Sequence, residues 1–246
     1  MPLPPRPPLA AVLATALLGL TAIAGGGFAI VHDLIREPTE AELLAARRTE
    51  AATRWRALNA GEIFPPRVDR RGQFSAPGQL LHTASRVGIA PEAPCRDAFD
   101  APVAAILDRH GCRTALRATY VDGSRTLVTT VSVVAMPDPA RAAKADGELS
   151  REIGVRGGKK TRGVRAVPFK GTLAASFDDS RRSDFWYSGN GTTYLFFRSS
   201  GWLTDRGSPA KYGTVESFDF AGYVTQALIK TFGSTTDVCE ERGVRC

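Results

Sequence analysis

The chain opens with an uncharged, apolar stretch over residues 9–31. At the helical rise these 23 residues extend about 34 Å, enough to cross a hydrocarbon core about 30 Å thick. The pattern therefore predicts a transmembrane anchor behind a short N-terminal tail, residues 1–8. Ala22 and Ala24 have the spacing of a signal-peptide cleavage site, so secretion after cleavage near Ala24 stays open as an alternative. We expect the uncleaved anchor, since the apolar run continues to Val31, and either route exports the remainder of the chain.

Residues 32–60 predict a helical stalk, with its helix beginning near Pro38. Thr39 can cap this helix and Glu42, three residues on, completes a capping box. Trp55 and Leu58 lie on one face at helical spacing, and we expect them to dock on the protein's own domain rather than form a coiled coil. Residues 61–94 are rich in Gly, Pro and Arg, which predicts a linker that wraps the edge of the domain and can contribute one short strand.

Residues 95–246 predict one extracytoplasmic domain in which helical and alternating patterns follow one another. Two hairpins carry the clearest turns, at Asp122-Gly123 and at Asn190-Gly191. The expected elements are a helix at 102–109, a hairpin at 116–121 and 127–136, a helix at 139–152, a strand at 164–177 that is broken near Pro168 and Gly171, a hairpin at 185–188 and 192–198, and a helix at 216–232. This order predicts an α+β fold, an antiparallel sheet with helices packed on it.

Four cysteines, Cys95, Cys112, Cys239 and Cys246, lie beyond the anchor with no C-x-x-C spacing. The even number predicts two disulfides of an exported domain, and four buried free thiols are the alternative. Of three possible connectivities, proximity favours Cys95 with Cys112 and Cys239 with Cys246. A continuous helix between the first two would hold them about 20 Å apart, which no disulfide tolerates. A short helix that begins at Pro102 removes this obstacle, because the preceding residues can fold back beside it.

The chain has a net charge of +7, and its excess is concentrated in one Gly-rich segment. Between Arg151 and Lys170 there are seven cations and one anion. Such a loop can attract anions at close range, so we expect an envelope polymer, a lipid headgroup or an acidic protein as partner. A solvated loop that only aids solubility is the alternative. We expect no nucleic-acid partner for an exported domain. The candidate binding residues are Arg156, Lys159, Lys160, Arg162 and Arg165.

The sequence contains only incomplete matches to known catalytic motifs. Ser208 and Lys211 match S-x-x-K, but the companion elements of that motif are missing. Asp178, Asp179 and Asp184 lack calcium-loop spacing and are typical of turn residues at a strand end. We predict no cofactor and no metal. A non-enzymatic interaction module is the expected function, and a cell-envelope hydrolase whose site is scattered in sequence is the alternative.

Two segments, CRDAFDAPVAAILDRHGCRTALRATYVDGSRTLVTTVSVVAMPD and TTYLFFRSSGWLTDR, resemble uncharacterised secreted or single-pass membrane proteins of actinomycetes, in which a cysteine pair precedes a hydrophobic hairpin. The resemblance covers about half of the chain. It implies an anchored extracytoplasmic domain and carries over no catalytic residue.

Overall fold

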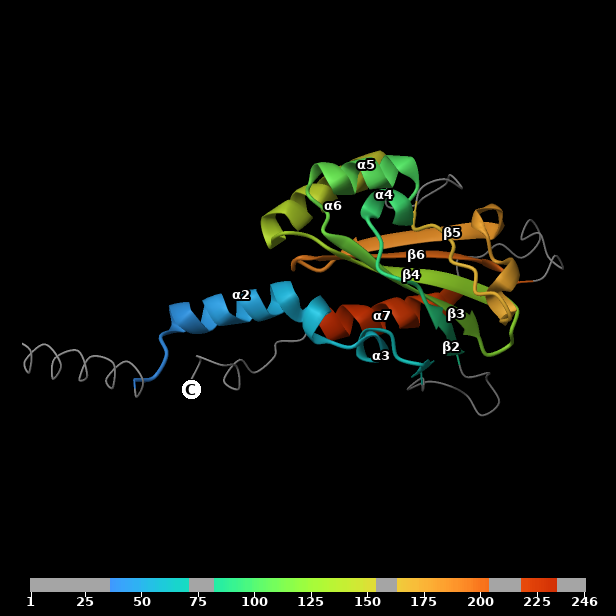
Figure 1. Cartoon of the computed structure of the whole chain (residues 1–246), viewed down its shortest axis with the longest axis horizontal. Coiled ribbons are helices and arrows are strands. Elements are labelled where there is room, and N and C mark those ends of the chain that lie inside the picture. The colour runs from blue at the N-terminus through green and yellow to red at the C-terminus, as the bar shows by residue number, and fades with distance from the viewer. Residues whose placement is uncertain (1–35, 71–81, 154–162, 204–217, 234–246) are drawn as a thin grey trace, which may run out of the picture. The chain divides into compact units, whose positions relative to one another are not determined.

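The computed structural model describes residues 36–70, 82–153, 163–203 and 218–233 (Figure 1). The described residues from Arg47 onward belong to one compact unit, and 36–46 belong to another. In these ranges no helix is long and apolar enough to cross a membrane. The predicted anchor, residues 9–31, lies outside the described residues.

The centre of the larger unit is a six-stranded antiparallel sheet with the order β1-β2-β3-β4-β6-β5. Each strand pairs with its neighbours over most of its length. The strands are β1 Arg67–Arg70, β2 His82–Ile89, β3 Thr114–Asp122, β4 Leu127–Ala135, β5 Arg182–Gly189 and β6 Tyr194–Trp202.

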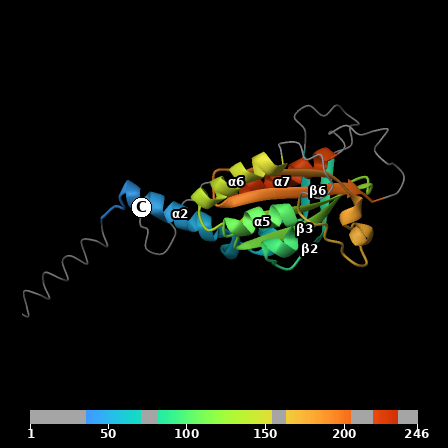
Figure 2. The same cartoon turned by 90° about the horizontal axis from the view of Figure 1, so that it is seen from above.

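Helices cover both faces of this sheet (Figures 1 and 2). Helix α7 (Asp219–Gly233) packs on one side, which we call the α7 face. Helices α4 (Cys95–Ala98), α5 (Ala101–Arg109) and α6 (Pro139–Ile153) pack on the other, the α5 face. The predicted α+β class is thus confirmed, with helices on two sides of an antiparallel sheet.

Strand β4 shows why both faces are covered, since nearly all of its side chains are buried. Val131 and Val133 point to the α7 face, where they pack with Phe196, Val224 and other apolar residues. Val134 points to the α5 face and packs with residues of α4, α5 and α6. Apolar residues on both sides of a strand require a layer over each.

Both predicted hairpins are present, as β3–β4 and β5–β6. The predicted helices at 102–109, 139–152 and 216–232 correspond to α5, α6 and α7, with bounds that differ by at most three residues. Asp100 occupies the N-cap of α5 and a proline stands in its first turn, as expected. Gly111 ends this helical region with a φ of +80°, a conformation that suits glycine.

The predicted linker at 61–94 is wrong, because it supplies strands β1 and β2 of the central sheet. The folded unit therefore begins well before Cys95. Strand β2 includes Ser85, Arg86 and Gly88, and it lacks the run of β-branched residues that marks β4. Its strand conformation comes from pairing with β3.

The predicted strand at 164–177 is also wrong. Its first part is extended backbone that crosses the sheet, and a short 3₁₀ helix, η1 (Leu173–Ser176), follows. The interruptions expected at Pro168 and Gly171 are present, and Gly171 has a φ of +78°, but no strand forms on either side of them.

Helix α2 (Glu40–Ala57) begins with the predicted capping box. The amide N–H of Thr39 donates to Glu42 at 2.8 Å, and the amide N–H of Glu42 donates to the Thr39 hydroxyl at 3.3 Å. At the other end of α2, Trp55 is buried and Leu58 packs beside it against the α7-face core. A second capping box at Asn59 starts the one-turn helix α3 (Ala60–Ile63).

Candidate functional site

A disulfide joins Cys95, at the start of α4, to Cys112, just after α5. Their α-carbons are 6.4 Å apart. This is possible because α4 and α5 are separate short helices, so the chain folds back as the sequence predicted. Cys95 is buried with Val103 and Leu107, and the bridge fixes both helices on the α5 face. Cys239 and Cys246 lie outside the described residues.

The extended residues 163–169, which we call the strap, cross the α5 face along one row of the sheet. The row consists of directly paired residues on five neighbouring strands: Phe185, Ser199, Thr130, Thr119 and Gly88. Three of these five residues carry hydroxyl groups and are fully buried, which is unusual for the middle of a sheet.

The hydroxyl groups of this row bind the backbone of the strap. Ser199 donates to the carbonyl oxygen of Val164 at 2.6 Å, and Thr119 donates to that of Val167 at 2.8 Å. The amide N–H of Val167 donates to Thr130 at 3.1 Å. The row therefore supplies hydrogen bonds to the strap in addition to the antiparallel bridge that Val164 forms with Phe99.

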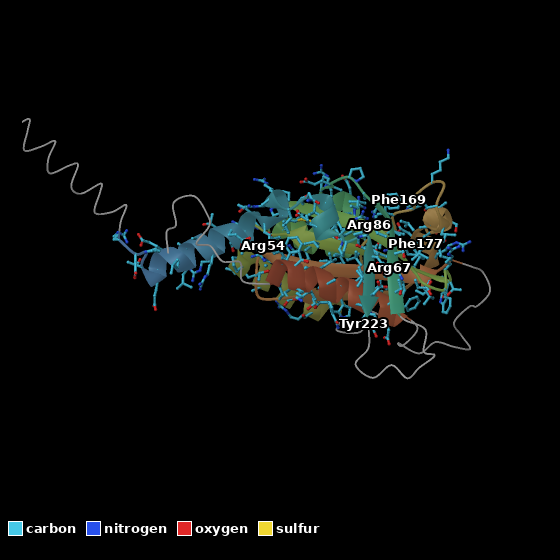
Figure 3. All side chains as sticks on the ribbon, turned by 90° about the horizontal axis from the view of Figure 1, so that it is seen from below. Arg54, Arg67, Arg86, Phe169, Phe177 and Tyr223 are labelled. Atoms are coloured by element: carbon cyan, nitrogen blue, oxygen red, sulfur yellow. A yellow bond between two sulfur atoms is a disulfide. The ribbon has the colours of Figure 1, made fainter. Side chains whose placement is uncertain are left out.

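The end of the row at β2 is a glycine because an aromatic ring occupies the space of a side chain. A Cβ atom at Gly88 would lie 2.3 Å from the ring of Phe169. Figure 3 shows Phe169 and, from the same strand as Gly88, Arg86. The ring fixes the far end of the strap on the sheet.

A buried ion pair holds the near end of the strap. Arg182 and Asp100 form two hydrogen bonds of 2.9 Å, and their side chains are 3% and 13% exposed. Asp100 also accepts from the amide N–H of Gly163 at 3.0 Å, and Arg182 donates to the carbonyl oxygen of Val164 at 3.0 Å. The pair thus connects the N-terminus of α5, the strap and β5.

Of the five predicted binding residues, the structure describes Arg165. Its amide N–H donates to the carbonyl oxygen of Ala98 at 2.8 Å, and its Nε donates to that of Phe99 at 3.0 Å. The residue is exposed, so its terminal guanidinium nitrogens can face solvent. Arg156, Lys159, Lys160 and Arg162 lie outside the described residues, between the end of α6 and the start of the strap.

Arg117, in the middle of β3, faces the same side of the sheet as the strap. It is half-buried, and its Nε is buried without a hydrogen-bond partner. Burial lowers its pKa, the carboxylate of Asp97 acts in the opposite sense, and the charge of Arg165 lowers the pKa further. The sequence placed Arg117 in a strand, but only the covering helices show that this side chain is enclosed.

The three aspartates that were weighed as an acidic site in the sequence each contact other residues of the protein. Asp178 caps the 3₁₀ helix η2 (Asp179–Arg181) by accepting from Ser180 at 2.9 Å. Asp179 accepts from the amide N–H of Ala166 at 2.8 Å. Asp184 lies 3.5 Å from Arg198 in an ion pair, and burial raises the pKa of its carboxyl group.

His110 Nε2 and Glu148 Oε2 lie 2.8 Å apart, which links the end of α5 to α6. Across the described part of the chain, no three His, Cys, Asp or Glu side chains form a group that could hold a metal ion.

A hollow of about 370 Å³ lies beside the C-terminal turn of α2 and the adjoining ends of β2 and β3. Its lining is mainly apolar, with charged residues among it. The lining residues are Trp55, Arg56, Leu58, Ala60, Ile63, Phe64, Ile89, Ala90, Glu92, Leu116 and Arg117.

No protein-family model, curated protein or solved structure matches this chain.

Proposed function

We propose that the protein is a membrane-held extracytoplasmic binding module that engages an anionic component of the cell envelope. The binding part is the segment that carries Arg156, Lys159, Lys160, Arg162 and Arg165, which we call the basic segment. Residues 9–31 form the anchor, residues 32–60 the stalk, and the sheet with its helices is the exported domain. In the alternative route, cleavage near Ala24 releases the same domain in secreted form.

The observation that carries this proposal is the way the strap is fixed where the basic segment ends. Gly163 is bound by Asp100, and Arg165 is bound by the carbonyl groups of Ala98 and Phe99. On its other side the segment follows α6, which packs against α5 and β6. A loop held at both ends on a rigid layer loses less conformational entropy when it binds, which favours a binding role.

The disulfide supports the extracytoplasmic location. Structural disulfides form and persist in oxidising compartments and are rare in the cytosol. The Cys95–Cys112 bridge lies in the same layer as the strap, so an oxidising environment also stabilises the support of the basic segment.

Charge replacement tests the binding role. We expect the variant Lys159→Gln, Lys160→Gln, Arg162→Gln to bind a soluble polyanion such as polyphosphate more weakly than the wild-type full-length chain. Its affinity should also fall less steeply with salt, because fewer counterions are exchanged. The matched control, Arg47→Gln, Lys144→Gln, Lys230→Gln, removes three exposed cations from helices and should retain the wild-type affinity. Equal losses in both variants would show a net-charge effect and refute a binding segment.

The same pair of variants separates envelope polymers from acidic proteins. An effect seen only with acidic protein partners, and not with polyanions or anionic vesicles, would reassign the segment to protein recognition.

Peptide mapping tests the location. The protein is purified from membranes after thiols are blocked, and digested without reductant. We expect Cys95 and Cys112 in one bridged peptide, and alkylation of both residues would place the domain in a reducing compartment.

A further inference from the structure

Arg117 differs from the other enclosed arginines. The other buried or half-buried arginines that the structure describes each have a hydrogen-bond acceptor or a counter-ion for the guanidinium group. The hydrogen-bonded pairs are Arg36 with Glu42, Arg54 with Glu50, Arg86 with the carbonyl oxygen of Phe64, Arg181 with that of Leu203, and Arg182 with Asp100. The Nε of Arg198 is also buried without a hydrogen bond, but Arg198 forms an ion pair with Asp184 at 3.5 Å. No acceptor among the described residues is bonded to Arg117, and its Nε is buried.

An enclosed guanidinium without an acceptor is costly, because its hydration is reduced and no protein group replaces the lost hydrogen bonds. Such a group in a folded protein requires an explanation, and a bound ion is among the common ones. Arg117 remains half-exposed, so an anion can reach it from solvent.

The surroundings of Arg117 contain further donors. Ser132 is its direct partner on β4 and points to the same face, and the hydroxyl group of Ser132 is fully buried without a partner. Arg165 is bonded to the carbonyl groups of Ala98 and Phe99 at the end of α4, and α4 packs on β3, the strand that carries Arg117. Of the three guanidinium nitrogens of Arg165, Nε is the one that is bonded to a described residue. The hydroxyl group of Ser132 is therefore the direct neighbour of Arg117 on the sheet, and Arg165 lies at the end of the helix that packs on the same strand.

We propose that Arg117 and Arg165 bind a phosphate group, with the hydroxyl group of Ser132 as a further donor toward it. The inference rests on the proposed function, since it names the chemical group that the anionic component presents. The basic segment attracts the polyanion, and Arg117 with Arg165 forms the fixed site where one phosphate is held.

Phosphate fits this site better than carboxylate does. A carboxylate is already close by, that of Asp97, yet it makes no hydrogen bond to Arg117 and pairs with Arg96 at 3.9 Å instead. A phosphate offers more oxygens and, as a dianion, balances two guanidinium charges at once.

Inorganic phosphate and glycerol 3-phosphate are the probes, titrated into the full-length oxidised chain in a phosphate-free, weakly coordinating buffer. Binding is followed by calorimetry and by the rise of Tm with probe concentration. We expect Arg117→Gln to weaken binding about tenfold or more, because it removes a charged donor pair. The control Arg113→Gln, an exposed arginine just before β3, should keep the wild-type affinity.

Two further variants keep the test decisive if Arg117→Gln folds poorly. Arg117→Lys retains the charge but loses the planar pair of donors, and it should bind more weakly than the wild type. Asp97→Asn removes only the neighbouring negative charge and should tighten binding roughly threefold. Wild-type affinity in both Arg117 variants, or weaker binding in Asp97→Asn, would overturn the proposal.

The probes also distinguish the source of the phosphate. Binding of both probes indicates recognition of the phosphate group itself, and binding of glycerol 3-phosphate alone indicates an ester; both results support the site. Equal binding of acetate and phosphate would refute it. The triple variant Lys159→Gln, Lys160→Gln, Arg162→Gln should bind inorganic phosphate within about twofold of the wild-type affinity. The same variant should bind polyphosphate more weakly than the wild type does. A failure of the basic segment and a failure of the Arg117 site therefore give different results.

Discussion

Thr119 and Thr130, direct partners on β3 and β4, share a hydrogen bond of 2.9 Å between their hydroxyl oxygens. Together they accept from and donate to the two backbone polar groups of one residue, Val167. A pair of buried threonines thereby holds an irregular segment on the face of a sheet, and it does so without any charged side chain.

Thr130→Val should release the middle of the strap. The change leaves the amide N–H of Val167 without its acceptor and also removes the partner of Thr119. We expect the free energy of unfolding to fall by about 1–3 kcal/mol in urea denaturation. Ser132→Ala is the control, since it removes a hydroxyl of the same strand face that has no partner, and it should change stability by less than about 0.5 kcal/mol. Equal losses of stability in Thr130→Val and Ser132→Ala would mean that the hydrogen bonds to the strap do not stabilise the protein.

Asp100→Asn should destabilise the protein far more than Asp97→Asn does. The first change leaves the guanidinium of Arg182, 3% exposed, without its main counter-charge. Breaking a buried pair from one side costs about 3–5 kcal/mol, and the second contact of Arg182 with Asp179 places this case near the lower figure. Asp97 is exposed, so Asp97→Asn should lower the free energy of unfolding by less than about 0.5 kcal/mol. Similar costs in denaturant unfolding would contradict a structural role for the pair.

Removing the disulfide should lower stability by about 3 kcal/mol, the chain-entropy value for two cysteines that are 17 positions apart in the sequence. The measurement is denaturant unfolding of Cys95→Ala, Cys112→Ala beside the wild type, each with and without reductant. The double variant should lose the response to reductant that this bridge causes. Cys239→Ala, Cys246→Ala is the matched control and should retain that response, and its failure to do so would assign the response to the other pair.

Glu148 should stabilise the protein less as the pH falls. The hydrogen bond from His110 holds the pKa of the Glu148 carboxyl group below its usual 4.5, and the charge of Arg109 acts in the same direction. A carboxyl group whose pKa is lower in the folded than in the unfolded state contributes stability above the unfolded value. That contribution is lost as the pH drops below about 4.5 toward the folded value. The stability gap between wild type and Glu148→Gln, measured from about pH 6 to pH 3, should therefore narrow; a constant gap would contradict this linkage.

Two glycine-to-alanine substitutions should change the stability of the protein in opposite directions. A Cβ atom at Gly201 would lie 2.1 Å from the carbonyl oxygen of Arg181 and 2.9 Å from the ring of Phe177. Backbone cannot move aside cheaply, so Gly201→Ala should cost about 3 kcal/mol. Gly147 lies in α6 with open space around it, and Gly147→Ala should stabilise by about 0.5–1 kcal/mol. Thermal unfolding of both variants checks the pair of signs, and a destabilised Gly147→Ala would show that this position is constrained.

Local patterns determined much of the fold. The β-branched run of β4, the turn at Asp122-Gly123, and the proline and glycine that bound α5 act over a few residues, so they can be read in order along the chain. The pairing of Cys95 with Cys112 followed from the same local reasoning, because the length of α5 decides whether the two cysteines can meet.

Tertiary structure alone decided the rest. Strand β2 has weak strand propensity and forms against β3, and the strap is held by hydroxyl groups that come together only when β3, β4 and β6 pair in register. Arg117 has the ordinary position of an alternating strand residue in the sequence. It becomes an enclosed, unpartnered cation only because α4 and the strap cover its face, and burial of that kind arises from contacts between residues far apart in the chain.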